Sequence, residues 1–411
     1  MHASLVRSAG RVVVVGAVLV VLSGCWPTPG AGPDRRSSNP FERTLTPATV
    51  SRLTEAFRAP LAEGAGPPVV TVDGLFVRTG RSMAAFEART GAPRWSVVLP
   101  PYENPVDDWV SDPYVVGDGE RVVASVTGYE LGGFYGSQLV TVAVDTGEVE
   151  RRQGLRGELW SLRDTRLGTI DPQGPGPDFT SIGVERLDAD DVWGGISFDI
   201  TGPAVATLGR DRLFVVNGGA VRSYDTTTPC PTAPPDHDIP VCVATWSSAG
   251  TTPVVIGDDA TVYVGSGTGA AGAVVALDED TGAVRFRAPL GAAVTQPPAL
   301  AGDVLYVATD DGRLSAVPAG GCGADQCPAS WSTGPGSRIR VQPAVAGGVV
   351  YVGAADGTLR AFDASGCGAA TCAPLWTADA GSPVTGGLAV YGGRLFVGTG
   401  GGLVGYRVPG D

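Results

Sequence analysis

The sequence repeats a short β pattern every 43 to 49 residues along most of its length. The clearest copy spans residues 342–381, where alternating apolar runs are separated by turn signals such as Asp356-Gly357. Alternation of this kind is typical of strands with one buried face, and Asp-Gly between two such runs indicates a hairpin. We therefore expect each repeat to form one four-stranded antiparallel sheet.

The copies align on one position of the second strand, which is usually aromatic. The aligned residues are Phe76, Val123, Gly168, Phe214, Tyr263, Tyr306, Tyr351 and Phe396. A steady period with four strands per repeat predicts an all-β protein, a β-propeller with one blade per repeat. Eight aligned positions predict eight blades. The copy at Gly168 fits least well, so seven blades plus an irregular sheet is the alternative.

The last repeat, residues 386–408, contains three strands and lacks a fourth. Near the other end of the chain, Phe57-Arg58-Ala59-Pro60-Leu61 repeats the fourth-strand sequence of the fifth repeat, residues 286–290. We predict that this N-terminal strand completes the last blade and closes the ring, because closure leaves no exposed sheet edge.

A further motif follows the third strand in several copies: a carboxylate, then Thr-Gly, then a large aromatic residue. It is carried by Ala85–Gly91 with Trp95 and by Ala276–Gly282 with Phe286, and less completely by Ala361–Asp363 with Trp376 and Leu187-Asp188 with Trp193. This motif resembles the quinoprotein-like (PQQ-like) propeller repeat, and the resemblance covers residues 54–408. It implies that the aromatic residue docks between neighbouring blades, which agrees with the packing role expected of one large aromatic per blade.

The chain begins with a targeting segment. Residues 1–24 contain Arg7 and Arg11 before an apolar core that is too short for a comfortable membrane span. The segment ends in Leu22-Ser23-Gly24-Cys25, which resembles the bacterial lipobox. That resemblance implies lipidation and a new N-terminus at Cys25, and hence an extracytoplasmic protein anchored to the bacterial cell membrane. Residues 25–48 are rich in Pro, Gly and Ser and predict a flexible tether, leaving residues 49–411 for the propeller.

The other six cysteines fall in three pairs, each between a third strand and the following aromatic residue. The pairs are Cys230/Cys242, Cys322/Cys327 and Cys367/Cys372. Cysteines paired within one hairpin of an exported chain indicate local disulfides. Metal binding is the competing interpretation, but two cysteines without histidine partners make a weak site.

Few residues suggest catalysis. After the leader the single histidine is His237, so a multi-histidine metal centre and a Ser-His-Asp triad are both disfavoured. Gly267–Gly272 matches a dinucleotide motif, but a β run follows it where that motif requires a helix. Carboxylates at Asp188, Asp190, Asp191 and Asp278-Glu279-Asp280 occupy turn positions of the repeat. We predict no catalytic residue, metal ion or cofactor. The quinoprotein dehydrogenases that the repeat resembles use two adjacent disulfide-bonded cysteines, and no Cys-Cys dipeptide occurs.

Two connections are longer than the repeat requires. They contain Tyr102, Trp109, Tyr114, Phe134 and Tyr135, which we predict to bind a partner, because aromatics in long loops are typical of recognition surfaces. The formal net charge of −13 argues against nucleic acid as that partner. Repeat and anchor together resemble the BamB family of outer-membrane assembly lipoproteins. The sequence thus favours a monomeric, membrane-anchored scaffold that binds protein in the cell envelope. A quinone-dependent dehydrogenase and a carbohydrate or peptidoglycan sensor are the alternatives.

Overall fold

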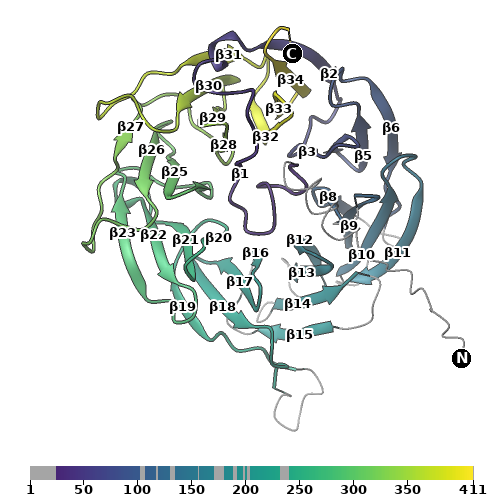
Figure 1. The fold of residues 1–411 in the computed structure, drawn as a ribbon. Coiled ribbons are helices and arrows are strands. Elements are labelled where there is room, and N and C mark those ends of the chain that lie inside the picture. Colours follow the sequence, from purple (N-terminus) through teal and green to yellow (C-terminus); the bar gives the residue numbers. More distant parts are fainter. Residues whose placement is uncertain are drawn as a thin grey trace, which may run out of the picture.

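The computed structural model describes residues 25–101, 107–116, 119–129, 135–155, 157–170, 180–187, 192–197, 200, 204–231 and 240–410. These residues form eight sheets around a central axis, which confirms the predicted eight-bladed propeller (Figure 1). Within each blade the strands of the repeat follow one another from the axis outward, with antiparallel neighbours. Among the described residues no helix is long and apolar enough to cross a membrane.

Blades 1 to 4 occupy the first half of the chain. Blade 1 consists of β3 (Val69–Val70), β4 (Leu75–Thr79), β5 (Ser82–Phe86) and β6 (Pro93–Val98). Blade 2 consists of β7 (Asp107–Val110), β8 (Tyr114–Val115), β9 (Arg121–Tyr129), β10 (Tyr135–Ala143) and β11 (Val149–Leu155). Blade 3 consists of β12 (Glu158–Arg163), β13 (Arg166–Ile170), β14 (Thr180–Arg186) and β15 (Val192–Ser197). Blade 4 consists of β16 (Val205–Leu208), β17 (Arg212–Asn217), β18 (Ala220–Asp225) and β19 (Trp246–Ala249).

Blades 5 to 8 complete the ring, and the last two also take strands from the N-terminal region. Blade 5 consists of β20 (Val255–Ile256), β21 (Thr261–Ser266), β22 (Ala273–Asp278) and β23 (Val284–Pro289), with the short 3-10 helix η2 (Gly269–Ala271). Blade 6 consists of β24 (Ala299–Ala301), β25 (Val304–Ala308), β26 (Leu314–Pro318) and β27 (Trp331–Ser332). Blade 7 consists of β1 (Ser38–Asn39), β28 (Ala344–Ala346), β29 (Val349–Gly353), β30 (Thr358–Asp363) and β31 (Trp376–Asp379). Blade 8 consists of β32 (Val384–Tyr391), β33 (Arg394–Thr399), β34 (Gly402–Arg407) and β2 (Thr54–Pro60), and the 3-10 helix η1 (Val50–Arg52) precedes β2.

The hydrophobic core lies between the blades. Six clusters of buried residues each join the facing sides of two neighbouring blades, and a seventh joins blades 7, 8 and 1 with the N-terminal segment. An inner strand therefore has neighbours on both faces: all six residues of β21 are buried. The outermost strand of a blade has solvent on its edge, and β6 alternates between exposed and half-buried residues. Apolar residues on both faces of the inner strands are what this layered packing requires.

The weak third repeat is a regular blade with one local change. The register between β12 and β13 shifts between Leu159 and Ser161, which marks a bulge. A Cβ atom on Gly168 would lie 2.5 Å from the Ser161 Oγ, so the position that is aromatic in most other blades has no room for a side chain here. The alternative of seven blades is thereby removed.

The fourth-strand aromatics dock between blades, as the repeat implies. The indole of Trp95 in blade 1 donates to the Val144 carbonyl of blade 2 at 2.8 Å, and the indole of Trp246 donates to the Glu279 carbonyl at 2.9 Å. Each ring covers a glycine of the Thr-Gly turn. A Cβ on Gly147, whose φ is +74°, would lie 2.7 Å from the Trp95 ring. Glycine is needed here both for its backbone conformation and for the close approach of the ring.

The N-terminal strand closes the ring. β2 pairs antiparallel with β34, with Phe57 opposite Gly405, and becomes the outer strand of blade 8. The Phe57 ring lies over Gly91 of blade 1, where it takes the place that tryptophan has in other blades. The predicted shared blade is confirmed.

Candidate functional site

The ring has two faces that differ in what they carry. The turn face is the one with the turns between first and second strands, such as 72–74 and 391–393, and between third and fourth strands. The loop face is the opposite one, with the second-to-third-strand loops and the blade-to-blade connections, such as 333–343. Successive antiparallel strands place these connections on alternate faces. Each candidate site can therefore be assigned to one face.

The cysteines confirm the predicted disulfides and lie on the turn face. Cys230–Cys242, Cys322–Cys327 and Cys367–Cys372 are bonded. Two of these turns also contact the preceding blade. The backbone N–H of Cys327 donates to the Arg287 carbonyl at 2.8 Å, and that of Cys372 donates to the Ser332 carbonyl at 2.9 Å. The cysteine turns therefore help to hold neighbouring blades together.

The segment predicted to be a flexible tether is packed inside the ring. Figure 1 shows it as the purple chain in the centre of the propeller. Trp26 is 1% exposed and pairs with Val70 of the innermost strand of blade 1, with N–H to carbonyl distances of 2.7 and 2.9 Å. The carbonyl of Pro27 accepts from Val115 of blade 2 at 2.8 Å. The inner edge of each first strand has no strand neighbour, so its backbone groups are available for these hydrogen bonds. A segment rich in Pro and Gly can follow this edge because its backbone bends easily.

After a turn at residues 28–33 the segment crosses to the other side of the ring. The carbonyl of Asp34 accepts from Ile256 of blade 5, and that of Arg36 accepts from Leu300 of blade 6. β1 then pairs parallel with β28 of blade 7, with Ser38 opposite Val345. Backbone hydrogen bonds thus join residues 26–39 to the inner strands of five blades, and the segment lies along the axis of the propeller. We call residues 26–39 the axial segment.

Charged side chains fix the axial segment to two further points. Asp34 forms an ion pair with Arg163 of blade 3. Arg36 forms an ion pair with Asp258 of blade 5 at 2.5 Å, and this contact lowers the pKa of the Asp258 carboxyl. The guanidinium of Arg36 also donates to the Ile256 carbonyl at 3.0 Å.

Beyond the axial segment the chain runs along the turn face towards β2. Glu42, 4% exposed, accepts hydrogen bonds from four backbone N–H groups. Its Oε1 accepts from residues 43–45 at 2.7 to 3.1 Å, and its Oε2 accepts from Gly393 of blade 8 at 3.0 Å. A carboxylate with this many donors fixes the loop to blade 8.

A cavity of about 210 Å³ opens between the axial segment and the loop-face ends of the inner strands. Trp26 and Gly30 line one side of it, and Gln296, Arg340 and Gln342 line the other. The side-chain amide of Gln342 donates to the Arg35 and Pro298 carbonyls, both at 2.8 Å. The axial segment therefore narrows the loop-face end of the propeller axis to this cavity.

Among the described residues, blade 2 departs furthest from a regular four-stranded blade on the loop face. β9 and β10 have nine residues each, more than any other described strand. β7 pairs with the end of β9, with Trp109 opposite Thr127, while β8 pairs with the inner part of β9. We call β7 with the paired ends of β9 and β10 the blade 2 extension. The long connections predicted from the sequence are thus built partly as sheet.

The aromatic residues predicted to bind a partner lie in different environments. Trp109 is half-buried on β7, and Tyr135 begins β10. Tyr102 and Phe134 lie outside the described residues. Tyr114 is 5% exposed, and its hydroxyl donates to the Trp160 carbonyl of blade 3 at 2.7 Å. Tyr114 therefore packs between blades 2 and 3, and the pKa of its phenol is raised by burial.

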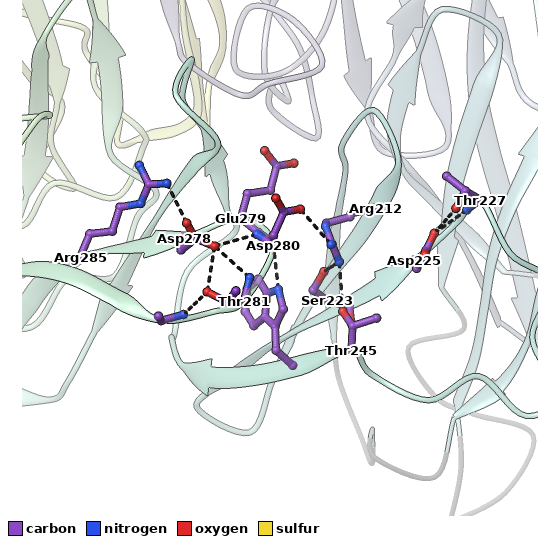
Figure 2. A network of polar contacts seen from close by, with 12 residues as sticks. Arg212, Ser223, Asp225, Thr227, Thr245, Asp278, Glu279, Asp280, Thr281 and Arg285 are labelled. Atoms are coloured by element: carbon purple, nitrogen blue, oxygen red, sulfur yellow. Dashed lines mark hydrogen bonds and ion pairs between the residues drawn. The ribbon is translucent and has the colours of Figure 1, made fainter.

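The acidic run Asp278-Glu279-Asp280 holds a turn, as expected of the repeat (Figure 2). Asp278 accepts from the backbone and hydroxyl of Thr281 at 3.0 and 2.8 Å and from Arg285 at 2.8 Å. These donors, Arg285 first, lower the pKa of Asp278 to about 2. Asp280 forms an ion pair with Arg212 of blade 4 at 3.0 Å, which ties two blades together.

The remaining sequence candidates are a glycine motif and several residues that the structure does not describe. Gly267–Gly272 forms a loop containing η2 and leads into β22, so the helix that a dinucleotide motif requires does not follow it. His237, Asp188, Asp190 and Asp191 lie outside the described residues. Within the part of the chain that the structure describes, no three His, Cys, Asp or Glu side chains are grouped to hold a metal ion.

Comparison with known proteins finds relatives of this repeat and of this fold. Residues 237–320 match the family model described as outer membrane protein assembly factor BamB. No curated protein sequence matches significantly. The chain is thus a β-propeller that contains a repeat similar to that of BamB.

Several solved structures share the fold at low identity. BamB from Moraxella catarrhalis aligns with a TM-score of 0.58 at 16% identity, over 87% of this chain and 98% of that one. Quinohemoprotein alcohol dehydrogenase from Comamonas testosteroni aligns with a TM-score of 0.64 at 14% identity, over 95% and 83%. The computationally designed Ika8 protein aligns with a TM-score of 0.62 at 15% identity, over 86% and 99%. At these identities the likeness concerns the fold alone.

Proposed function

We propose that this protein is a lipid-anchored, extracytoplasmic scaffold whose propeller binds a protein partner of the cell envelope and catalyses no reaction. The observation that supports the proposal is the blade 2 extension, which gives one sector of the loop face an added strand and longer strand ends that the other blades lack within the described residues. Binding residues are often found on such additions to a rigid scaffold. Trp109 is its aromatic centre within the same part of the chain.

The axial segment supports a scaffold over an enzyme. In a propeller the axis is a common place for a ligand, because the inner strands of all blades converge there. Here Trp26 and its neighbours occupy much of that volume and hydrogen-bond to the inner strands, which leaves a cavity of about 210 Å³. The free surface of the molecule is therefore its outer faces, which suit a macromolecular partner.

Two further features support the cell envelope as the location. Local disulfides are typical of oxidising compartments outside the cytoplasm. The lipobox at residues 22–25 would place diacylglycerol on Cys25, and the match to the BamB family model agrees with an envelope-associated protein. β2 supplies the fourth strand of blade 8, so that the ring is complete within one chain, and we propose that the protein is a monomer.

The experiment is capture of membrane partners by the intact, lipidated protein. Trp109→Ala should weaken capture by at least about tenfold with the fold intact, since truncating a central aromatic of an interface typically costs ~2 kcal/mol or more. The matched control is Val243→Ala, which removes an apolar side chain that is 67% exposed on the turn face. Loss of capture with Val243→Ala and retention with Trp109→Ala would contradict the proposal.

A further inference from the structure

The position of Cys25 in the ring fixes how the propeller would lie on a membrane. Cys25 is the first described residue; it is 6% exposed and lies at the turn-face end of the axial segment, beside the 72–74 turn of blade 1 and Tyr391 of blade 8. Its neighbour Trp26 is already paired with Val70 and buried inside the ring. Consecutive Cα atoms are about 3.8 Å apart, so the chain has almost no slack between the anchor residue and the folded ring.

We propose that the turn face is the membrane-facing surface of this protein, held directly against the lipid headgroups by Cys25. The inference rests on the proposed lipidation. In place of a flexible tether between the lipid and the propeller, it assigns a rigid attachment. A flexible tether of about 20 residues would let the ring tumble within roughly 25 Å of the bilayer. The Trp26–Val70 pairing instead gives the ring one orientation, with the loop face and the blade 2 extension directed away from the membrane.

The surface around Cys25 has the chemistry of a headgroup contact. Val72, in the adjacent turn, is 52% exposed, and Phe41, in the loop that Glu42 fixes to blade 8, is 53% exposed. These are two of the six large apolar side chains that stand out as exposed among the described residues. Apolar side chains beside a lipid anchor insert at the boundary between headgroups and acyl chains.

Two arginines lie on the same face, while the charged residue beside Cys25 itself is Asp73 of the 72–74 turn. Arg43 lies two residues after Phe41 and donates to the Pro40 and Glu42 carbonyls, and Arg52 donates to the Pro409 carbonyl. Both arginines are exposed. The formal net charge of the protein, −13, would repel anionic lipid. Arg43 and Arg52 give the turn face two positive charges that can contact the phosphate groups of the lipid.

The test uses the absence of lysine from the natural sequence, which makes one introduced lysine the only side-chain amine to label. Val72→Lys places the label on the turn face. Gly334→Lys is the matched control on the loop face, where a Cβ would meet no atom within 4 Å and φ is not positive. Each lipidated variant is labelled with an amine-reactive fluorophore and reconstituted in phosphatidylcholine vesicles containing a lipid with a nitroxide headgroup. The natural, lysine-free protein is labelled in parallel, and its signal, which comes from the α-amine of Cys25, is subtracted from that of both variants.

The label at position 72 should be quenched several-fold more strongly than the label at position 334, because strands of five to nine residues separate the two faces by about 20 Å. A second preparation of each variant carries a 20-residue Gly-Ser insertion between Cys25 and Trp26. That linker should abolish the difference while lipid incorporation continues.

The outcomes separate the two levels of the proposal. If radiolabelled lipid incorporates but position 72 is not quenched more strongly than position 334, the orientation is wrong and the lipid anchor remains. If the Gly-Ser insertion leaves the difference in quenching unchanged, the claim that Cys25 attaches the propeller rigidly to the membrane is wrong. If no lipid incorporates into the natural sequence, the anchor fails, and the orientation fails with it.

Discussion

The indole N–H of Trp376 donates a hydrogen bond to the backbone carbonyl of Leu53, 323 residues earlier in the sequence, at 3.0 Å. In other blades the corresponding indole reaches a carbonyl just after the third strand of the next blade, as Trp246 reaches Glu279. In blade 8 the third strand is the last of the chain, and Leu53, which leads into β2, supplies the acceptor. The contact therefore joins the two ends of the propeller at the point where the ring closes.

This contact predicts a graded loss of stability. Trp376→Ala should lower the free energy of unfolding by about 3–5 kcal/mol, because it removes a buried aromatic side chain. Trp376→Phe keeps most of the packing and removes the hydrogen bond, so a loss nearer to about 1–2 kcal/mol is expected. Denaturant unfolding followed by tryptophan fluorescence and circular dichroism measures both. Equal stability of all three proteins would show that the seam at Leu53 contributes nothing to closure.

The shared blade itself can be tested by deletion. Removing residues 54–60 takes away β2, so β34 becomes an exposed edge and Phe57 no longer covers Gly91. We expect a lower midpoint of thermal unfolding and association through the free edge, visible by light scattering. An unchanged midpoint in a monomeric deletion variant would contradict ring closure by this strand.

Glu42 predicts how firmly the N-terminal region is held. Glu42→Ala leaves four backbone N–H groups without their acceptor in a buried loop, which should cost about 2–3 kcal/mol of stability. Glu42→Gln keeps one carbonyl oxygen and replaces the other acceptor with an amide nitrogen, so either residues 43–45 or Gly393 lose their acceptor. An intermediate loss is therefore expected. Hydrogen exchange at residues 43–45 and 393 reports the local effect, and unchanged exchange in Glu42→Ala would contradict it.

The ionised Asp278 carboxylate is predicted to stabilise the fold in a way that is lost in acid. Its pKa in the fold is about 2, below its ordinary value of 3.8, so the carboxylate form stabilises the turn. That stabilisation is present above pH 3.8 and is lost as the pH falls through about 2. Asp278→Asn should flatten the pH dependence of stability in this window and lower stability at neutral pH. If the free energy of unfolding of Asp278→Asn falls with acid in the same way as that of the natural protein, the role of Asp278 is contradicted.

Most of the fold could be predicted from the sequence because the repeat is local. Each blade forms from one stretch of chain, so the strands, the Thr-Gly turns and the cysteine pairs can be recognised in order. Even the closing strand left a local signal, since Phe57–Leu61 copies residues 286–290. Gly168 was the exception, and its bulge depends on Ser161, which no repeat position indicates.

The centre of the ring could not be predicted in the same way. Residues 26–39 have the composition of a tether, and their partners lie far away in the sequence, such as Val70 and the side chain of Gln342. Backbone hydrogen bonds to inner strands leave no periodic pattern. The one available signal was Trp26, because a large aromatic residue is unusual in a flexible linker. Tyr114 was misleading for a similar reason: its partner, the Trp160 carbonyl, belongs to the next blade.

The most direct test of the scaffold proposal is site-specific photo-crosslinking in living cells. A photoreactive phenylalanine replaces Trp109 on the blade 2 extension in one strain and Val243 on the turn face in another, in otherwise natural, lipidated protein. The account predicts one discrete protein adduct from position 109, identified by mass spectrometry, and no protein adduct from position 243. A discrete protein adduct at position 243 with none at position 109 would contradict it.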